Sequence, residues 1–242
     1  MGYDDPWDAS VLEHGDIEAL APNLWWVWSA CPGAPVRRNM AVIRLPDGGL
    51  ILHSPTCLDD ERMAAIDALG PVRFLLVPSA GHRSDLKRFA ARYPDAKVIA
   101  PRNARAEVEK VGPVHEDCEA ALPPLGIGVQ APDGMKDGYE LVYTVPLDDG
   151  GSALVVNDVL GGSHPHPVPG FQGFLGKMLG PPGGELGMAR IVRFMFGKDM
   201  VRFRAFVSAL AEQPDLRVLF TSHGGPVTED VPGALRAAAA RI

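Results

Sequence analysis

The sequence predicts an α/β fold in which two mixed sheets pack face to face and helices cover their outer sides. Each half of the chain opens with strands joined by tight turns and continues with strands that alternate with helices. The strands are short and continuously apolar, as at residues 74–77 (FLLV), and such runs are typical of strands covered on both faces. We expect one domain over residues 16–242, preceded by a loose polar lead-in over residues 1–15.

In the first half, aromatic and β-branched residues predict a strand at 24–29. Two apolar runs at 40–45 and 50–52 predict a hairpin around a Pro-Asp-Gly-Gly turn. Apolar spacing and an acidic first turn predict a helix over 58–69. The strand at 74–77 and the helical spacing through Leu86, Phe89 and Tyr93 repeat this unit. The remaining elements are a short strand at 96–100 and a helix through Lys110 with Asn103 as its N-cap.

The second half repeats the plan and adds an insert. Asp/Gly turns separate predicted strands at 126–131, 139–145 and 153–157. The insert spans 161–196; it is rich in glycine and proline at first and has helical spacing at its end. We expect it to lie as a lid beside the strand ends, because it follows Asp158 closely and its Phe, Met and Leu residues need an apolar surface to cover. A helix at 201–210, a strand at 216–220 and an alanine-rich helix at 231–242 complete the chain.

Composition narrows the possible partners. The 242 residues are 46% hydrophobic and carry a net charge of −7, and no cluster of Lys and Arg offsets the acidic surplus, which argues against nucleic acid. No basic, apolar leader begins the chain and no apolar run approaches the roughly 20 residues of a membrane span. We therefore expect a cytoplasmic protein with a small-molecule ligand and no membrane partner. Three widely spaced cysteines indicate neither a disulfide framework nor a thiolate zinc site.

Three polar residues follow predicted buried strands: His82, Asp158 and His223. Sites in open α/β sheets lie at the carboxyl ends of strands, so these side chains are expected to converge although they are far apart in sequence. Two imidazoles and a carboxylate suit one zinc, iron or manganese ion and leave positions for water and substrate. In the alternative interpretation, the two histidines are hydrogen-bonded to Asp158 and no ion binds.

Four further residues could either orient one of these metal ligands or take its place. His53 follows a strand and could support the site or cap the next helix, and Asp85 lies in a first helical turn, where the dipole favours a carboxylate in any case. His164 and His166 alternate around Pro165, so both could face a metal or both could be solvated.

Four segments resemble the metallo-β-lactamase superfamily: LILHSP, FLLVPSAGHRSD, YTVPLDDGGSALVVNDVL and LFTSHGGPV. The resemblance covers about residues 16–242. More specifically, the chain resembles an uncharacterised subfamily in which the metal motif is degraded. It implies a four-layer αββα sandwich with a site along one edge.

The metal motif departs from that superfamily. Its His-x-His-x-Asp-His pattern should fall on residues 79–84, where none of the four ligands is present, and no histidine occurs at 143–152. The resemblance retains Asp158 at the bridging carboxylate position and His223 as the final histidine, with His82 offset by one residue. We therefore expect no dinuclear zinc centre and at most one divalent metal.

Two functional hypotheses follow. The first is a hydrolase-like enzyme with at most one divalent metal, and the alternative is a metal-free fold relative that binds a small molecule or a partner. A third, metal-free enzyme would use His82 as a base near Ser79, Ser84 or Cys57.

Overall fold

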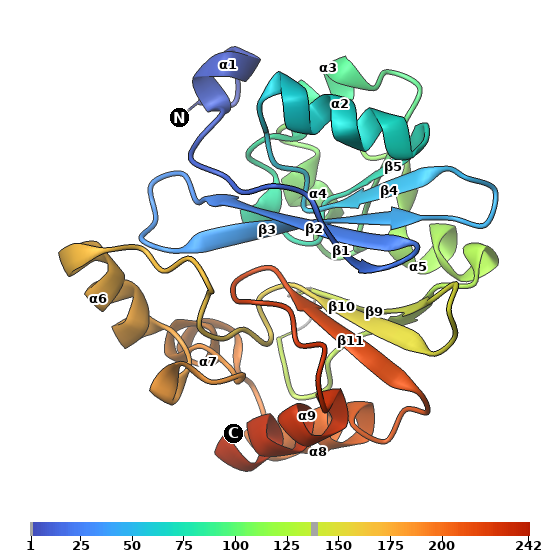
Figure 1. Cartoon of the computed structure of the whole chain (residues 1–242). Helices are drawn as coiled ribbons and strands as arrows, with labels where there is room; N and C mark the ends of the chain where they lie inside the picture. The colour runs from blue at the N-terminus through green and yellow to red at the C-terminus, as the bar shows by residue number, and fades with distance from the viewer. Residues whose placement is uncertain (1, 137–139) are drawn as a thin grey trace. The chain divides into compact units, whose positions relative to one another are not determined.

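The computed structural model describes residues 2–136 and 140–242, without the side chain of Gln172 (Figure 1). Contacts within the chain divide it into two compact units. Unit 1 comprises Met1–Gly33 and Asn39–Leu125, and unit 2 comprises Ala34–Arg38 and Gly126–Ile242. No helix among the described residues is long and apolar enough to cross a membrane.

Unit 1 is built on a mixed sheet in which strands β1 to β7 follow one another in sequence order. The hairpins β1–β2 and β3–β4 are antiparallel, whereas β4, β5, β6 and β7 run parallel. The strands are β1 Glu18–Ala21, β2 Leu24–Ala30, β3 Arg37–Arg44, β4 Leu50–His53, β5 Val72–Leu76, β6 Lys97–Ala100 and β7 Glu116–Asp117. The helices are α1 Trp7–Ser10, α2 Asp60–Leu69, α3 Leu86–Arg92, α4 Arg105–Val108 and α5 Cys118–Ala121.

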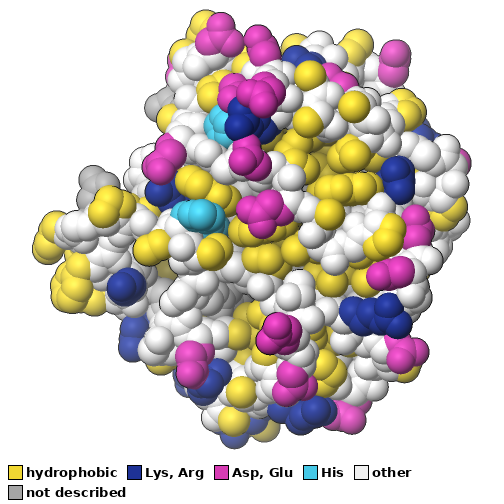
Figure 2. All heavy atoms as spheres, in the orientation of Figure 1, with side chains coloured by type: hydrophobic (Ala, Val, Ile, Leu, Met, Phe, Trp, Pro, Cys, Tyr) yellow, Lys and Arg dark blue, Asp and Glu magenta, His cyan; other side chains and the backbone are white. Residues whose placement is uncertain are grey.

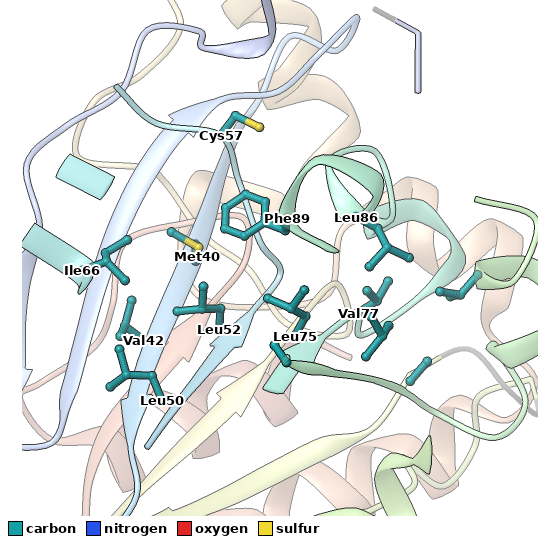
Figure 3. Close-up of a cluster of buried hydrophobic side chains, with 14 of the residues drawn as sticks. Met40, Val42, Leu50, Leu52, Cys57, Ile66, Leu75, Val77, Leu86 and Phe89 are labelled. Carbon is teal, nitrogen blue, oxygen red and sulfur yellow. The ribbon is translucent and has the colours of Figure 1, made fainter. Parts of the chain in front are cut away.

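The core of unit 1 follows from the two-residue period of its strands. Alternate residues of β3 and β4, such as Val42 and Leu52, are fully buried in one cluster with Ile66 of α2 and Phe89 of α3 (Figure 3). Full burial of each such side chain contributes roughly 1.5–3 kcal/mol. This cluster fixes the strands whose carboxyl ends carry His53 and His82.

The lead-in differs from the loose segment expected at residues 1–15. It contains α1, whose Trp7 lies with its ring centroid 5.0 Å from that of Phe89 and donates a hydrogen bond from Nε1 to the carbonyl of Leu58 at 2.9 Å. Arg88 also binds the carbonyl of Asp5 at 2.7 Å. An aromatic anchor and backbone acceptors therefore hold the segment against unit 1.

Unit 2 is built on a smaller mixed sheet with the order β11-β10-β9-β8. The strands β8, β9 and β10 are antiparallel neighbours, and β11 pairs in parallel with β10. Leu154 and Leu219 of this sheet are buried with Phe203, Val207 and Leu235 of the helices. The strands are β8 Gly128–Gln130, β9 Val142–Pro146, β10 Ser152–Val156 and β11 Leu216–Thr221, and the helices are α6 Gly170–Leu179, α7 Arg190–Phe196, α8 Met200–Leu210 and α9 Val231–Arg241.

Most predicted elements lie within a few residues of the observed ones, and three differ. The N-cap of α4 is Ala104 rather than Asn103. The strand expected at 139–145 is β9, which begins at Val142; Tyr139 lies outside the described residues. Helix α6 occupies the glycine- and proline-rich part of the insert, where no helix was predicted.

Candidate functional site

The parallel pairing of β10 and β11 brings Asp158 and His223 together. Val156 and Thr221 are register partners, and each candidate lies two residues beyond its strand's partner position. The His223 Nε2 atom is 3.1 Å from Asp158 Oδ1, although 65 residues separate the two in sequence. Both side chains are partly exposed, at 28% for His223 and 21% for Asp158. The sheet therefore delivers an accessible imidazole–carboxylate pair.

The other ring nitrogen of His223 fixes its tautomer. Nδ1 lies 2.6 Å from the backbone carbonyl of Arg37, and because a carbonyl only accepts, Nδ1 donates. Burial by itself lowers the pKa of His223, but the hydrogen bond and charge of Asp158 outweigh it, so that the pKa is raised. Without a bound ion, the ring of His223 bridges the carbonyl of Arg37 and the carboxylate of Asp158.

A buried carboxylate, Glu140, holds the backbone that presents Asp158. Its Oε2 atom accepts from the amide of Asp158 at 2.7 Å, and Oε1 accepts from the amides of Val159 at 2.8 Å and Asn157 at 3.3 Å. Burial, followed by the negative charge of Asp158, raises the pKa of Glu140 to about 8. Glu140 thus orders three consecutive amides beneath the candidate site.

Glu140 was not among the residues predicted from the sequence. The only sequence feature that could have indicated it is its position directly before the apolar run 141–143. Such a residue is usually solvated at a strand end, whereas this one is buried.

Glycines allow the loop after Asp158 to pack against the loop of His223. The amide of Gly162 donates to the carbonyl of His223 at 3.1 Å. A Cβ atom at Gly161 would lie 2.5 Å from the same oxygen, too close for any other residue without movement. Gly224 has a φ of +152°, and a Cβ atom there would lie 2.6 Å from the amide nitrogen of Gly162. These close contacts hold the loop after Asp158 against the loop that contains His223.

The pair opens into a cavity of about 390 Å³ within unit 2. Asp158, His223, Arg37 and His164 line its polar part. Residues of the insert line much of the rest, so the insert lies beside Asp158 and His223, where the sequence analysis placed it. Some of its large apolar side chains are exposed, however. They include Phe171 and Phe174 of α6 and Phe194 of α7, and Figure 2 shows hydrophobic side chains at the surface over α6.

His164 and His166 contact each other rather than standing alone in solvent. The amide of His166 donates to Nδ1 of His164 at 3.0 Å, and the carbonyl of His166 accepts from Nε of Arg37 at 3.0 Å. Burial, together with the nearby positive groups His166 and Arg37, lowers the pKa of His164 to about 4. His164 therefore lines the cavity as a neutral imidazole near pH 7.

The remaining candidates belong to unit 1. His82 ends the short 3₁₀ turn Ala80–His82 after β5, and its Nδ1 atom is 2.8 Å from Oγ of Ser54. Ser54 follows β4 in the left-handed region with a φ of +57°, an uncommon conformation for serine. Its hydroxyl is a hydrogen-bond partner of His82 that the third hypothesis did not name. The convergence of His82 with Asp158 and His223 stays a prediction.

His53 and Asp85 lie inside the fold of unit 1. Both are fully buried, and His53 is the last residue of β4. Asp85 precedes α3 but makes no capping hydrogen bond; it accepts from the amide of Cys57 at 3.3 Å and pairs with Arg88 at 3.2 Å. These contacts give Asp85 a structural role.

Arg83 lies in the 79–84 segment, on which the superfamily's metal motif should fall. Its guanidinium pairs with Glu107 of α4 at 3.2 Å. The side chain is thus held within unit 1.

Comparison with solved structures identifies the fold. The chain is similar to the metallo-β-lactamase FIM-1 from Pseudomonas aeruginosa in its mono-zinc form, with a TM-score of 0.58, 15% identity and coverage of 96% of this chain and 98% of that one. For the metallo-β-lactamase DIM-1 exposed to ceftazidime the TM-score is 0.60 at 14% identity, with coverage of 94% and 98%. For a metallo-β-lactamase from Erythrobacter litoralis it is 0.57 at 15%, with coverage of 93% and 96%.

The sequence by itself gives no such match. A scan of family models finds none for this chain, and neither does a search of curated proteins. Identities this low establish the fold and leave the chemistry to the residues present. The prediction of the fold class is confirmed: the chain has the α/β metallo-β-lactamase fold, with two mixed sheets and their helices.

Proposed function

We propose that the protein is a hydrolase-like enzyme that acts on a small molecule and holds at most one divalent ion. Asp158 and His223 would bind the ion, and His82 is the third ligand that we propose from the sequence. The observation that supports this most is the Asp158–His223 pair, 3.1 Å apart, with Nδ1 of His223 held by the carbonyl of Arg37.

The donor chemistry of the pair fits a divalent ion. A carbonyl on one ring nitrogen is the usual outer support of a metal-binding histidine, because it directs the other nitrogen toward the ion. Nε2 of His223 can therefore bind an ion when it carries no proton, next to the carboxylate of Asp158. Imidazole and carboxylate together suit zinc, iron or manganese.

The chain's own residues position and enclose the reaction. A divalent ion, when bound, supplies Lewis acidity at the bond to be cleaved. Glu140 holds the backbone of Asp158, and the amide of Gly162 holds the backbone of His223, so neither ligand needs to reorganise. The apolar part of the cavity excludes water around the substrate.

The test joins metal content to hydrolysis. Wild-type protein with one equivalent of Zn²⁺ should cleave activated esters, and a chelator should remove the activity. Asp158→Asn should lose both metal and activity. Asp149→Asn, an exposed acid in the β9–β10 turn, is the matched control and should retain both. Cleavage that is insensitive to both the chelator and Asp158→Asn would contradict the proposal.

One observation favours the metal-free alternative, in which the cavity only binds a ligand. Asp158 and His223 already contact each other at 3.1 Å, and the hydrogen bond to Asp158 helps to raise the pKa of His223. In that case, Zn²⁺ would neither bind with micromolar or tighter affinity nor support cleavage, while a ligand would still occupy the cavity. The third hypothesis has less support, because Ser79 and Cys57, two of its three candidate nucleophiles, are buried.

A further inference from the structure

We propose that the substrate is a carboxylic ester with an apolar acyl chain, which lies in the cavity of unit 2 with its carbonyl beside Asp158 and His223. This inference rests on the proposed hydrolase function. Water adds to the acyl carbon and the bond from this carbon to the alkoxy oxygen breaks. One proton of the water passes to the departing alkoxy oxygen, and the products are one carboxylic acid and one alcohol.

The cavity has polar lining residues, including Asp158, His223 and Lys177, but most of its lining is apolar. Its volume of about 390 Å³ lies within the range of about 300–1,000 Å³ that small-molecule sites occupy. Away from Asp158 and His223, the aliphatic side chains Val36, Leu160, Val168, Ile191 and Val192 line its wall. An apolar chain gains free energy on such a wall, whereas a polar chain would lose its hydrogen bonds to water.

Helix α6 borders this region with two glycines, in addition to Lys177 and Leu179. Gly173 and Gly176, spaced by three residues on one helical face, both line the cavity. A Cβ atom at Gly176 would lie 2.5 Å from the carbonyl of Pro35, and one at Gly173 would collide with the carbonyl of Val168. The glycines thus let α6 approach the 34–36 and 168 segments closely.

The aromatic residues of α6 lie on the other side of the helix. Phe171 and Phe174 are 74% and 58% exposed, and neither lines the cavity. The two phenylalanine rings therefore do not fill the cavity, whose aliphatic lining suits a slender aliphatic chain.

The experiment is a chain-length series. The kcat/KM for 4-nitrophenyl acetate, butanoate, hexanoate and octanoate is measured with one equivalent of Zn²⁺ present. Each added methylene should raise kcat/KM about three- to four-fold until the cavity is filled. Ile191→Asp and Val168→Asp place a charge on the wall and should lower the octanoate value at least ten-fold with little effect on acetate.

Phe194→Asp is the matched control, because Phe194 lies on α7 near Ile191, is 85% exposed and does not line the cavity. It should keep the chain-length dependence. The two wall variants, Ile191→Asp and Val168→Asp, lie in different segments, so the test still works if one of them misfolds. Circular dichroism shows whether each variant is folded.

A second readout separates this inference from the proposed function. Calorimetric titration with methyl ketones of the same chain lengths measures binding without cleavage. Ester cleavage with no dependence on chain length would overturn the inference and leave the hydrolase proposal standing. Chain-length-dependent ketone binding without ester cleavage would support the apolar chain site and contradict the hydrolase. Neither binding nor cleavage would overturn both.

Discussion

The strand ends of the two units differ in what their polar residues contact. In unit 1, His53 and Asp85 are fully buried, and Asp85 is tied to Arg88 and to the amide of Cys57. In unit 2, Asp158 and His223 are partly exposed and line a cavity. The same sequence pattern, a polar residue after a buried strand, thus gives buried side chains at His53 and Asp85 and cavity-lining side chains at Asp158 and His223. Burial and partners, rather than position after a strand, distinguish the two.

The largest effect is expected in unit 2. His223→Ala removes the ring that bridges Asp158 and the carbonyl of Arg37, so hydrolysis should fall on the order of 10³-fold. The free energy of unfolding should change much less, since the side chain is partly exposed. Ester hydrolysis and urea unfolding of the same preparation measure the two quantities. Full activity with a large loss of unfolding free energy would show that His223 supports the fold rather than the reaction.

Asp85→Ala should show the opposite behaviour. It leaves the guanidinium of Arg88 buried without its carboxylate, which costs about 3–5 kcal/mol of unfolding free energy, while activity per folded molecule is retained. The control is Asp67→Ala. Asp67 pairs with Arg92 at 2.8 Å on the surface, and its loss should cost less than about 1 kcal/mol. Equal costs for the two variants would remove the distinction between buried and exposed carboxylates.

Glu140 sharpens the comparison, because it is buried yet acts next to the proposed site. In Glu140→Gln, one carboxylate oxygen becomes an amide group that cannot accept from the backbone of residues 157–159. Leaving a buried amide unpaired costs about 1–3 kcal/mol, and we expect kcat to fall about ten-fold while KM changes little. Unfolding and steady-state kinetics test both. A stability loss with unchanged kcat would make Glu140 purely structural.

The smallest effect concerns pH. The unfolded His164 binds a proton near its ordinary pKa of 6.5, but the folded one does so only near pH 4. Between these values the unfolded state holds more protons, so stability falls as the pH drops from about 6.5 to about 4. His164→Asn should reduce this acid loss by on the order of 1 kcal/mol, with allowance for partial exposure. Urea unfolding at pH 7 and pH 4.5 gives the loss of unfolding free energy for each protein. An equal loss in the wild type and in His164→Asn would contradict this prediction.

The fold could be predicted because its signals are local. Period-two apolar runs, the Pro-Asp-Gly-Gly turn and the acidic start of α2 each specify an element through nearby residues. Helix α6 was missed because glycine at 170, 173 and 176 lowers helix propensity, whereas close packing against the carbonyls of Pro35 and Val168 requires glycine there.

The site could be predicted only in part. Asp158 and His223 were identified because each follows a predicted buried strand, and the observed pairing of β10 with β11 brings these two strand ends together. Glu140 and the Ser54–His82 hydrogen bond were missed, because no pattern along the chain reveals which buried carboxylate accepts from a distant loop or which hydroxyl meets a ring. Such partners depend on the folded backbone.

The number of divalent ions per chain tests the central proposal most directly. The protein is loaded with Zn²⁺, freed of excess and measured by inductively coupled plasma mass spectrometry, with His223→Ala and the exposed His166→Asn in parallel. We expect one ion per wild-type chain, close to one for His166→Asn and close to none for His223→Ala. Two ions per wild-type chain, or one ion that persists in His223→Ala, would contradict it.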